Sequence, residues 1–185
     1  EETKLSFLGF GTMNGKDGKP FKTREGGVMR LETLIKDIND EMFTKIVENR
    51  SVRDKDARDT AEIVGLAAIK YGDLSNQATK DYVFDVDRFT SFEGNTGPYI
   101  LYTIVRIKSI LNRYEEEGGN LREGVILPPA SDIEKNLMMQ LTGFGLTVES
   151  AFDEKAPHKI CAYIYDVSNA FNSFYHETKI LSEED

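Results

Sequence analysis

The segment from Ser91 to Leu111 constrains the fold more strongly than any other part of the sequence. Its first half is rich in turn-forming residues and contains Asn95 and Thr96, whose side-chain oxygens can cap the free N–H groups at the start of a helix. Pro98 suits the first helical turn, because its missing N–H is not needed there. Apolar residues then recur at spacings of three and four, at positions 100, 104, 107 and 111. We therefore expect a capped helix that lies at the centre of a helical core.

Other parts of the sequence also have the periodicity of helices. Apolar residues spaced by three or four occur over 31–46 and 160–174, and a third stretch, rich in alanine, spans 61–69. Ser131 and Glu134 have the spacing of a capping box at another helix start. These patterns predict four or five helices, so we assign the chain to the mainly α class, as a helical bundle.

Strand patterns are short and lie mostly near the N-terminus. Leu5–Met13 partly alternates and is rich in aromatic residues, and Lys19–Arg24 is a second extended piece. The tight-turn dipeptides Asn14-Gly15 and Asp17-Gly18 stand between them, which predicts a short N-terminal β-hairpin. Tyr82–Arg88 alternates apolar and charged residues, so we expect it to be extended.

The chain is acidic, with a formal net charge of −9 over 185 residues. A strongly acidic chain binds nucleic acid poorly by nonspecific attraction. However, the segment from Gly11 to Arg30 carries five cations and only two anions, which predicts one local phosphate-facing spot. The single cysteine, Cys161, excludes a disulfide within this sequence, and no apolar run approaches the roughly 20 residues of a membrane span. We expect a cytoplasmic protein without membrane contact.

A glycine- and lysine-rich stretch, Asn14–Thr23, is one candidate for chemistry. Glycines let the backbone approach a ligand closely, and lysines supply positive charge for phosphate oxygens. The stretch is not a P-loop, because only three residues separate Gly11 from Gly15. The alternative interpretation is an ordinary solvated hairpin turn.

The last predicted helix carries a polar and aromatic row beside its apolar stripe, formed by Tyr165, Asn169, Asn172 and His176. Such side chains can stack on unpaired RNA bases and hydrogen-bond to their edges. Alternatively, the tyrosines are core residues whose hydroxyl groups reach water. Both interpretations stay open on this pattern alone.

Four carboxylates gather at Asp81, Asp85, Asp87 and Glu93. Clustered carboxylates can bind a metal ion, but no glycine stands where a calcium loop requires one. Arg88 lies close enough in the sequence to neutralise them. We therefore predict structural salt links here, and no metal site.

Five segments, taken in order, resemble the C-terminal half of arginyl-tRNA synthetases. They are Gly9–Arg24, Lys70–Ser75, Asp81–Asp87, Ser91–Tyr99 and Tyr163–Tyr175. The sequence Ser-Phe-Glu-Gly-Asn-Thr-Gly-Pro-Tyr within them is specific to this family rather than to tRNA ligases in general. The resemblance covers nearly the whole chain and implies the family's signature loop followed by most of its anticodon-binding domain.

The resemblance implies that the lysine-rich stretch binds ATP. Lys19-Pro-Phe-Lys22-Thr23 matches the spacing of the family's signature loop, which holds ATP phosphates and stabilises charge on the leaving pyrophosphate. Lys22 and Lys19 are then the expected catalytic residues, with Lys16 and Arg24 as further ATP-binding residues. ATP, with magnesium, is a substrate of the full-length enzyme, and we expect this chain itself to hold no cofactor.

The helical remainder resembles the family's anticodon-binding domain, which implies arginine tRNA as a partner. From their chemistry, we expect five residues of the last helix to face this RNA: Tyr163, Asn169, Asn172, Phe174 and Tyr175. We divide the chain into the edge of the catalytic domain at 1–30, a helical connecting region at 31–90 and the anticodon-binding domain at 91–185. We expect a monomer.

Other parts of the family pattern are missing from this sequence. It contains no His-Ile-Gly-His signature, no nucleotide-binding sheet and no arginine pocket, and it ends before the last helices expected of an anticodon-binding domain. We therefore expect a fragment that does not activate arginine alone. Two alternatives stay open: a stand-alone helical module that docks a protein partner without binding RNA, and a nucleotide-binding enzyme built on the lysine-rich stretch.

Overall fold

The computed structural model describes residues 3, 5–20, 30–48, 54–120 and 125–180, and within them the protein is mainly helical, as predicted. The helices are α1 (Leu31–Glu48), α2 (Asp54–Leu74), α3 (Val86–Phe89), α4 (Gly97–Glu116), α5 (Asp132–Thr142), α6 (Phe144–Asp153) and α7 (Pro157–Glu177). Two short strands, β1 (Met13–Asn14) and β2 (Tyr82–Val83), pair with each other. No helix within these ranges is both long and apolar enough to cross a membrane.

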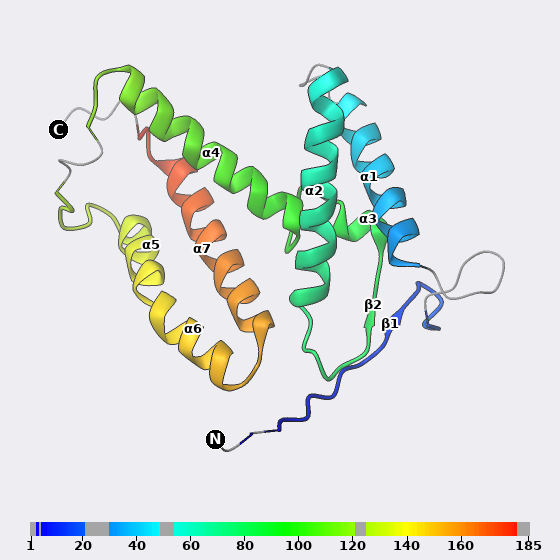
Figure 1. Cartoon of the computed structure of the whole chain (residues 1–185). Helices are drawn as coiled ribbons and strands as arrows, with labels where there is room; N and C mark the ends of the chain where they lie inside the picture. The colour runs from blue at the N-terminus through cyan, green and yellow to red at the C-terminus, as the bar shows by residue number, and fades with distance from the viewer. Residues whose placement is uncertain (1–2, 4, 21–29, 49–53, 121–124, 181–185) are drawn as a thin grey trace.

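The main hydrophobic core lies between α1, α2 and the segment around α3 (Figure 1). The apolar stripe predicted in the first helix supplies four buried residues: Leu34, Ile38, Met42 and Ile46. Phe84 and Phe89 close the core from the β2–α3 segment, with ring centres 4.6 Å apart. Burying apolar surface contributes about 25 cal/mol per Å². The segment that leads into α4 is therefore held firmly against α1 and α2.

The helix predicted around Pro98 is α4, which lies between α2 and α7 (Figure 1). Thr96 caps it, because its Oγ1 accepts a hydrogen bond of 3.2 Å from the backbone N–H of Tyr99. Gly97 lets the helix begin directly against α2, since a Cβ at this position would lie 2.3 Å from the carbonyl oxygen of Ala67.

Asn95, the other predicted cap, has a different partner. Its Oδ1 lies 2.5 Å from the hydroxyl oxygen of Tyr71 on α2, and that hydroxyl also lies 2.9 Å from the carbonyl oxygen of Cys161 on α7. Burial raises the pKa of Tyr71, so the hydroxyl stays protonated and available as a donor. One side chain thus links α2, the turn before α4 and α7.

The expectation that α4 is central in the core is right only for its first turns. Ile100 is buried, whereas Ile104 is 41% exposed and Leu111 is 38% exposed. The buried residues of α4 all lie between Gly97 and Thr103. The helix meets α2 only near its start and then extends away from it, so the later apolar residues lack that neighbour (Figure 1).

The helix start predicted at Ser131 is confirmed, with one of the two capping-box bonds shifted by one residue. The Oγ of Ser131 accepts from the N–H of Glu134 at 3.1 Å, and the Glu134 carboxylate accepts from the N–H of Ala130 at 2.6 Å. Gly143 then separates α5 from α6. The final helix, α7, packs against α4 on one side and against α5 and α6 on the other (Figure 1).

The strands include a parallel pair that the sequence patterns did not predict. β1 pairs with β2 in parallel, with Met13 opposite Tyr82 and Asn14 opposite Val83. Of the expected hairpin, the described residues contain one antiparallel bridge, between Asn14 and Pro20, and residues 21–24 lie outside them. The extended segment predicted over Tyr82–Arg88 is a strand only at Tyr82–Val83, because Asp85 caps α3 soon after it.

Candidate phosphate loop and nucleic-acid interface

The lysine-rich stretch forms a tight turn from Gly15 to Lys19, which we call the lysine turn. The N–H of Gly18 donates to the carbonyl oxygen of Gly15 at 2.9 Å, and the N–H of Gly15 donates to the carbonyl oxygen of Lys19 at 2.8 Å. Gly18 has a φ of 72°, a value that glycine adopts without strain. The Asp17 carboxylate also accepts from the N–H of Lys19 at 3.1 Å. These bonds hold the turn closed and leave the Lys19 side chain exposed.

The strand before the turn is fixed to the segment that precedes α3. The N–H of Thr12 donates to the Asp81 carboxylate at 2.7 Å, and this bond lowers the pKa of Asp81. The carbonyl oxygen of Thr12 accepts from the N–H of Tyr82 at 3.1 Å, and that of Asn14 accepts from the N–H of Phe84 at 2.8 Å. Because Phe84 is buried in the core, this pairing anchors the lysine turn to the body of the protein.

Lys16 lies between two carboxylates. Its Nζ is 3.0 Å from Oδ1 of Asp85 and 2.7 Å from Oδ2 of Asp87. Hydrogen bonding to these acids, first Asp87 and then Asp85, raises the pKa of Lys16, and the ammonium group lowers the pKa of Asp87. The predicted salt links are confirmed for Asp85 and Asp87, with Lys16 as their partner. Arg88 lies over the ring of Phe89 instead, with Cζ 5.9 Å from its centre.

The other predicted phosphate ligands cannot all be placed. Lys19 is at the end of the lysine turn, while Lys22 and Arg24 lie outside the described residues. Within the described part of the chain, no cluster of three or more histidine, cysteine, aspartate or glutamate side chains has an arrangement that could hold a metal ion.

Two of the residues predicted to face RNA are engaged inside the protein. Asn172 is 9% exposed, and its Nδ2 lies 2.9 Å from the hydroxyl oxygen of Tyr99 and 3.1 Å from Oγ1 of Thr103. Its Oδ1 accepts a hydrogen bond from the Arg106 guanidinium. Asn169 accepts from the Tyr99 hydroxyl at 2.7 Å. These amides therefore connect α7 to α4.

Tyr163 connects α7 to α5. Its hydroxyl group donates to the carbonyl oxygen of Gln140 at 3.0 Å, and its ring centre is 6.0 Å from that of Phe144. The ring is half-buried, as is that of Phe174 further along α7. Among the five predicted residues, Tyr175 is the most open to solvent, at 37% exposure.

Tyr175 belongs to a cation–aromatic cluster that the sequence did not reveal. The Arg106 guanidinium carbon lies 4.5 Å from the centre of the Tyr175 ring and 4.8 Å from that of Tyr102. Phe171 stacks on Tyr175 with a separation of 6.2 Å between ring centres. The cluster presents flat aromatic surface and positive charge together, which is the chemistry that binds unpaired bases and backbone phosphates.

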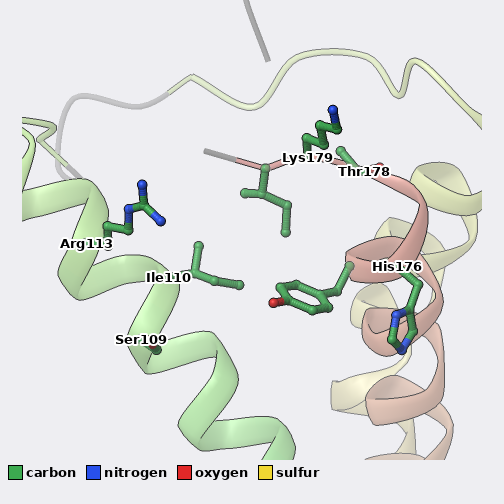
Figure 2. A pocket seen from close by; sticks show the side chains of 8 residues that line it. Ser109, Ile110, Arg113, His176, Thr178 and Lys179 are labelled. Carbon is green, nitrogen blue, oxygen red and sulfur yellow. The ribbon is translucent and has the colours of Figure 1, made fainter. Parts of the chain in front are cut away.

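A cavity of about 420 Å³ opens beside this cluster, between the C-terminal ends of α4 and α7 (Figure 2). Its lining residues are Ser109, Ile110, Arg113, Tyr175, His176, Thr178, Lys179 and Ile180. Arg113 lines the cavity from α4, and Thr178 and Lys179 line it from the segment after α7 (Figure 2). The sequence analysis missed this site, although Tyr102, Arg106 and Arg113 are spaced by four and seven along one side of α4 and this pattern could have indicated it.

Two family matches, one to each half, together account for most of the chain. Residues 1–86 match the tRNA synthetases class I (R) catalytic domain, and residues 100–185 match the DALR anticodon binding domain. The arginine–tRNA ligase of Agathobacter rectalis is 64% identical over 192 residues, which cover 100% of this chain and 32% of that protein. The chain belongs to the arginyl-tRNA synthetase family.

Further arginyl-tRNA synthetases are similar to this chain in sequence or in fold. The arginine–tRNA ligase of Alkaliphilus oremlandii is 60% identical, with 99% of this chain and 31% of that protein covered. The Plasmodium falciparum arginyl-tRNA synthetase superimposes with a TM-score of 0.72 at 26% identity, over 95% of this chain and 29% of that one. The Thermus thermophilus arginyl-tRNA synthetase shares the fold, with a TM-score of 0.78 at 23% identity, over 96% of this chain and 30% of that one.

This chain spans about a third of the length of the arginine–tRNA ligases that it matches. The two matched regions leave residues 87–99 between them, which contain most of α3, the turn before α4 and the first three residues of α4. The side chains of Asp87 and Thr96 therefore lie at the joint between the part that matches a catalytic domain and the part that matches an RNA-binding domain.

Proposed function

We propose that this chain is part of an arginine–tRNA ligase, which activates arginine with ATP and transfers it to arginine tRNA. The observation that carries the proposal is the ordered match of its two halves to the catalytic and anticodon-binding domains of this family. By itself the chain is proposed to be inactive in arginine activation, because it corresponds to only about a third of its relatives.

In the proposed reaction, the arginine carboxylate attacks the α-phosphorus of ATP and pyrophosphate leaves. Lys22 and Lys19 neutralise the negative charge that develops on the leaving phosphates, which is electrostatic stabilisation of the transition state. Lys16 and Arg24 support the same loop. The closed lysine turn and the exposed Lys19 side chain support this role, since a phosphate loop requires a cation held on a fixed backbone.

Arginine tRNA is proposed to bind at the C-terminal ends of α4 and α7. Tyr175 offers an open aromatic surface, and Arg106 and Arg113 supply positive charge beside it. Tyr163 and Phe174 are proposed to extend this surface along α7. Asn169 and Asn172 are proposed to serve RNA binding by fixing α7 against α4, since their amides are bonded to α4.

The test is arginine-dependent exchange of pyrophosphate into ATP by the ligase that contains this chain. Lys22→Ala and Lys19→Ala are each expected to lower the exchange rate by about tenfold or more, on the order of one lost charge contact in the transition state. Lys36→Ala, an exposed lysine on α1, is the matched control and should leave the rate unchanged. Wild-type rates in both signature-loop variants would contradict the proposed role of the loop.

A second candidate, a helical module that docks a protein partner, is favoured by apolar residues on the surface of α6. Phe144 is 58% exposed, Leu146 is 75% exposed and Phe152 is 81% exposed. A measurement of tRNA binding distinguishes the two candidate functions. A ligase component should prefer arginine tRNA over a noncognate tRNA at low salt, and a docking module should bind neither.

A further inference from the structure

The Lys16 ammonium group is held by acids rather than left free for a ligand. Two carboxylates lie within 3.0 Å of its Nζ, one on Asp85 and one on Asp87. A lysine ammonium has three donors, and two of them are already directed at negative oxygens. In this arrangement Lys16 offers little net positive charge to a phosphate group. Its position therefore calls for a role other than direct phosphate binding.

The contact extends the pairing between two distant segments. Backbone hydrogen bonds join Thr12 to Tyr82 and Asn14 to Phe84, and within the described residues no further backbone bond joins the two segments beyond this point. Lys16 lies two residues beyond Asn14, and its side chain reaches Asp85 and Asp87, just beyond Phe84. The contacts between the two segments therefore continue into the lysine turn through this side chain. Without it, the turn would lose its side-chain contact with the 85–87 segment, and its own internal hydrogen bonds would open more often.

The positions of the two carboxylates are fixed by the N-cap of α3 and by the hydrophobic core beside it. Asp85 is the N-cap of α3, where its Oδ1 accepts from the N–H of Asp87 at 3.1 Å and from that of Arg88 at 3.4 Å. The residues on either side of this cap, Phe84 and Phe89, are 1% and 4% exposed. Lys16 is thus attached to a point whose place is set by the hydrophobic core.

We propose that Asp85 and Asp87 are positioning residues that hold the lysine turn through Lys16, so that Lys19 stands at a fixed place for the ATP phosphates. This inference rests on the proposed function of the loop. Lys16 acts here through its carboxylate partners, and it does not touch ATP. Asp85 lies within the match to the catalytic domain and Asp87 directly follows that match, so both acids lie at or beside the joint between the two family matches.

The two possible roles of Lys16 predict opposite effects of removing the acids. If Lys16 contacts phosphate, Asp85 and Asp87 compete for it, and removing their charge should tighten ATP binding. If Lys16 positions the turn, removing their charge should slow the reaction as much as removing Lys16 itself. The pair is largely exposed, so the effect of losing it is modest.

The experiment is a double-mutant cycle in the ligase that contains this chain, with Lys16→Met, with Asp85→Asn and Asp87→Asn together, and with all three changes. We expect each set to lower kcat for pyrophosphate exchange by about three- to tenfold, with the KM for arginine unchanged. The triple variant should be no slower than Lys16→Met or the double aspartate variant. Lys16→Arg should keep most of the wild-type rate. Asp40→Asn, which removes a carboxylate paired with Arg58 at 3.2 Å, is the control and should leave kcat unchanged.

Additive losses, unchanged rates or a lower KM for ATP in the aspartate variant would each overturn the inference. A second measurement decides it independently of activity: hydrogen exchange of the Gly15 and Gly18 amides. Both amides should exchange faster in Lys16→Met and in the aspartate variant, and unchanged exchange would also overturn the inference. A wild-type ligase without arginine-dependent exchange would instead contradict the proposed function.

Discussion

The Asn172 side chain on α7 lies 2.9 Å from the Tyr99 hydroxyl on α4, so two residues 73 positions apart in the sequence share a part-buried polar contact between their helices. The same amide reaches Thr103 and Arg106, also on α4. A buried amide must have such partners, because an unpaired one costs about 1–3 kcal/mol. The contact therefore determines how α7 is oriented on α4, and with it the position of Tyr175 beside Arg106.

Replacing this amide should weaken the fold. Asn172→Ala leaves Thr103 and Arg106 without their shared partner, so we expect the free energy of unfolding in urea to fall by about 1–3 kcal/mol. Asn136→Ala, at an exposed position on α5, is the matched control and should change it by less than about 0.5 kcal/mol. Equal stability of the two variants would show that the polar contact between α4 and α7 contributes nothing.

Replacing each of two glycines with alanine should change the stability of the protein in opposite directions. A Cβ at Gly97 would lie 2.3 Å from the carbonyl oxygen of Ala67, so Gly97→Ala must push α4 away from α2 and should cost about 1–3 kcal/mol. No atom lies within 4 Å of a Cβ at Gly145 in α6, so Gly145→Ala should gain about 0.5–1 kcal/mol from helix propensity. Thermal unfolding of both variants measures the difference, and a stable Gly97→Ala protein would contradict the close packing.

Binding of arginine tRNA should depend on the cation–aromatic cluster. Tyr175→Ala removes the open ring beside Arg106 and should weaken binding by about five- to a hundredfold, as for one lost base-stacking contact. Phe152→Ala, which removes an exposed aromatic ring from α6, is the control and should bind as wild type. If the two variants bind alike, the RNA surface lies elsewhere on the chain.

The cations beside the cavity should appear in the salt dependence of binding. Arg113→Ala and Lys179→Ala are each expected to reduce the slope of log K against log salt by about 1, because each removes one phosphate contact. Titration of the wild-type and variant proteins at several salt concentrations gives this slope directly. A slope that stays constant in both variants would exclude these two side chains from phosphate binding.

The contact between Lys16 and its acids should be visible in their titration. The pKa of Asp87 is lowered by Lys16, so this contribution to stability is present above the unfolded pKa of about 4 and is lost as pH falls through the folded pKa. The pKa of Lys16 is raised, so its contribution is present below its unfolded pKa of about 10.4 and is lost as pH rises through the folded value. In Lys16→Met, the NMR titration of Asp87 should move upward; an unmoved titration would rule out the ion pair in solution.

Local patterns were enough to predict most of the helices. The caps at Thr96 and Ser131 and the apolar stripe of α1 are all decided by residues within a few positions of one another. The strand pairing was not predictable in this way. Met13 and Tyr82 are 69 positions apart, and each strand is two residues long, so no alternation distinguishes this parallel pair from a hairpin with residues 19–24.

The polar row on the last helix was predicted correctly as a row, but most of it faces α4. The signal was present in both helices: Tyr99, Thr103 and Arg106 are spaced by four and three on α4, as Tyr165, Asn169 and Asn172 are on α7. Two polar rows of equal spacing can form hydrogen bonds with each other when their helices pack. A single helix does not reveal whether its polar side chains meet RNA or another helix, and Tyr175 was separable from Asn172 only by its exposure.

The parallel pairing of β1 with β2 has a consequence for chain length. Because the two strands lie side by side, the chain enters and leaves the α1–α2 pair at the same place (Figure 1). Insertions and deletions at the far ends of α1 and α2 would leave the path from the lysine turn to α4 unchanged. Between Asp81 and Gly97, by contrast, one added residue would shift α4 relative to the lysine turn. Members of this family should therefore differ in length at the outer ends of α1 and α2, and keep a constant length between β2 and α4.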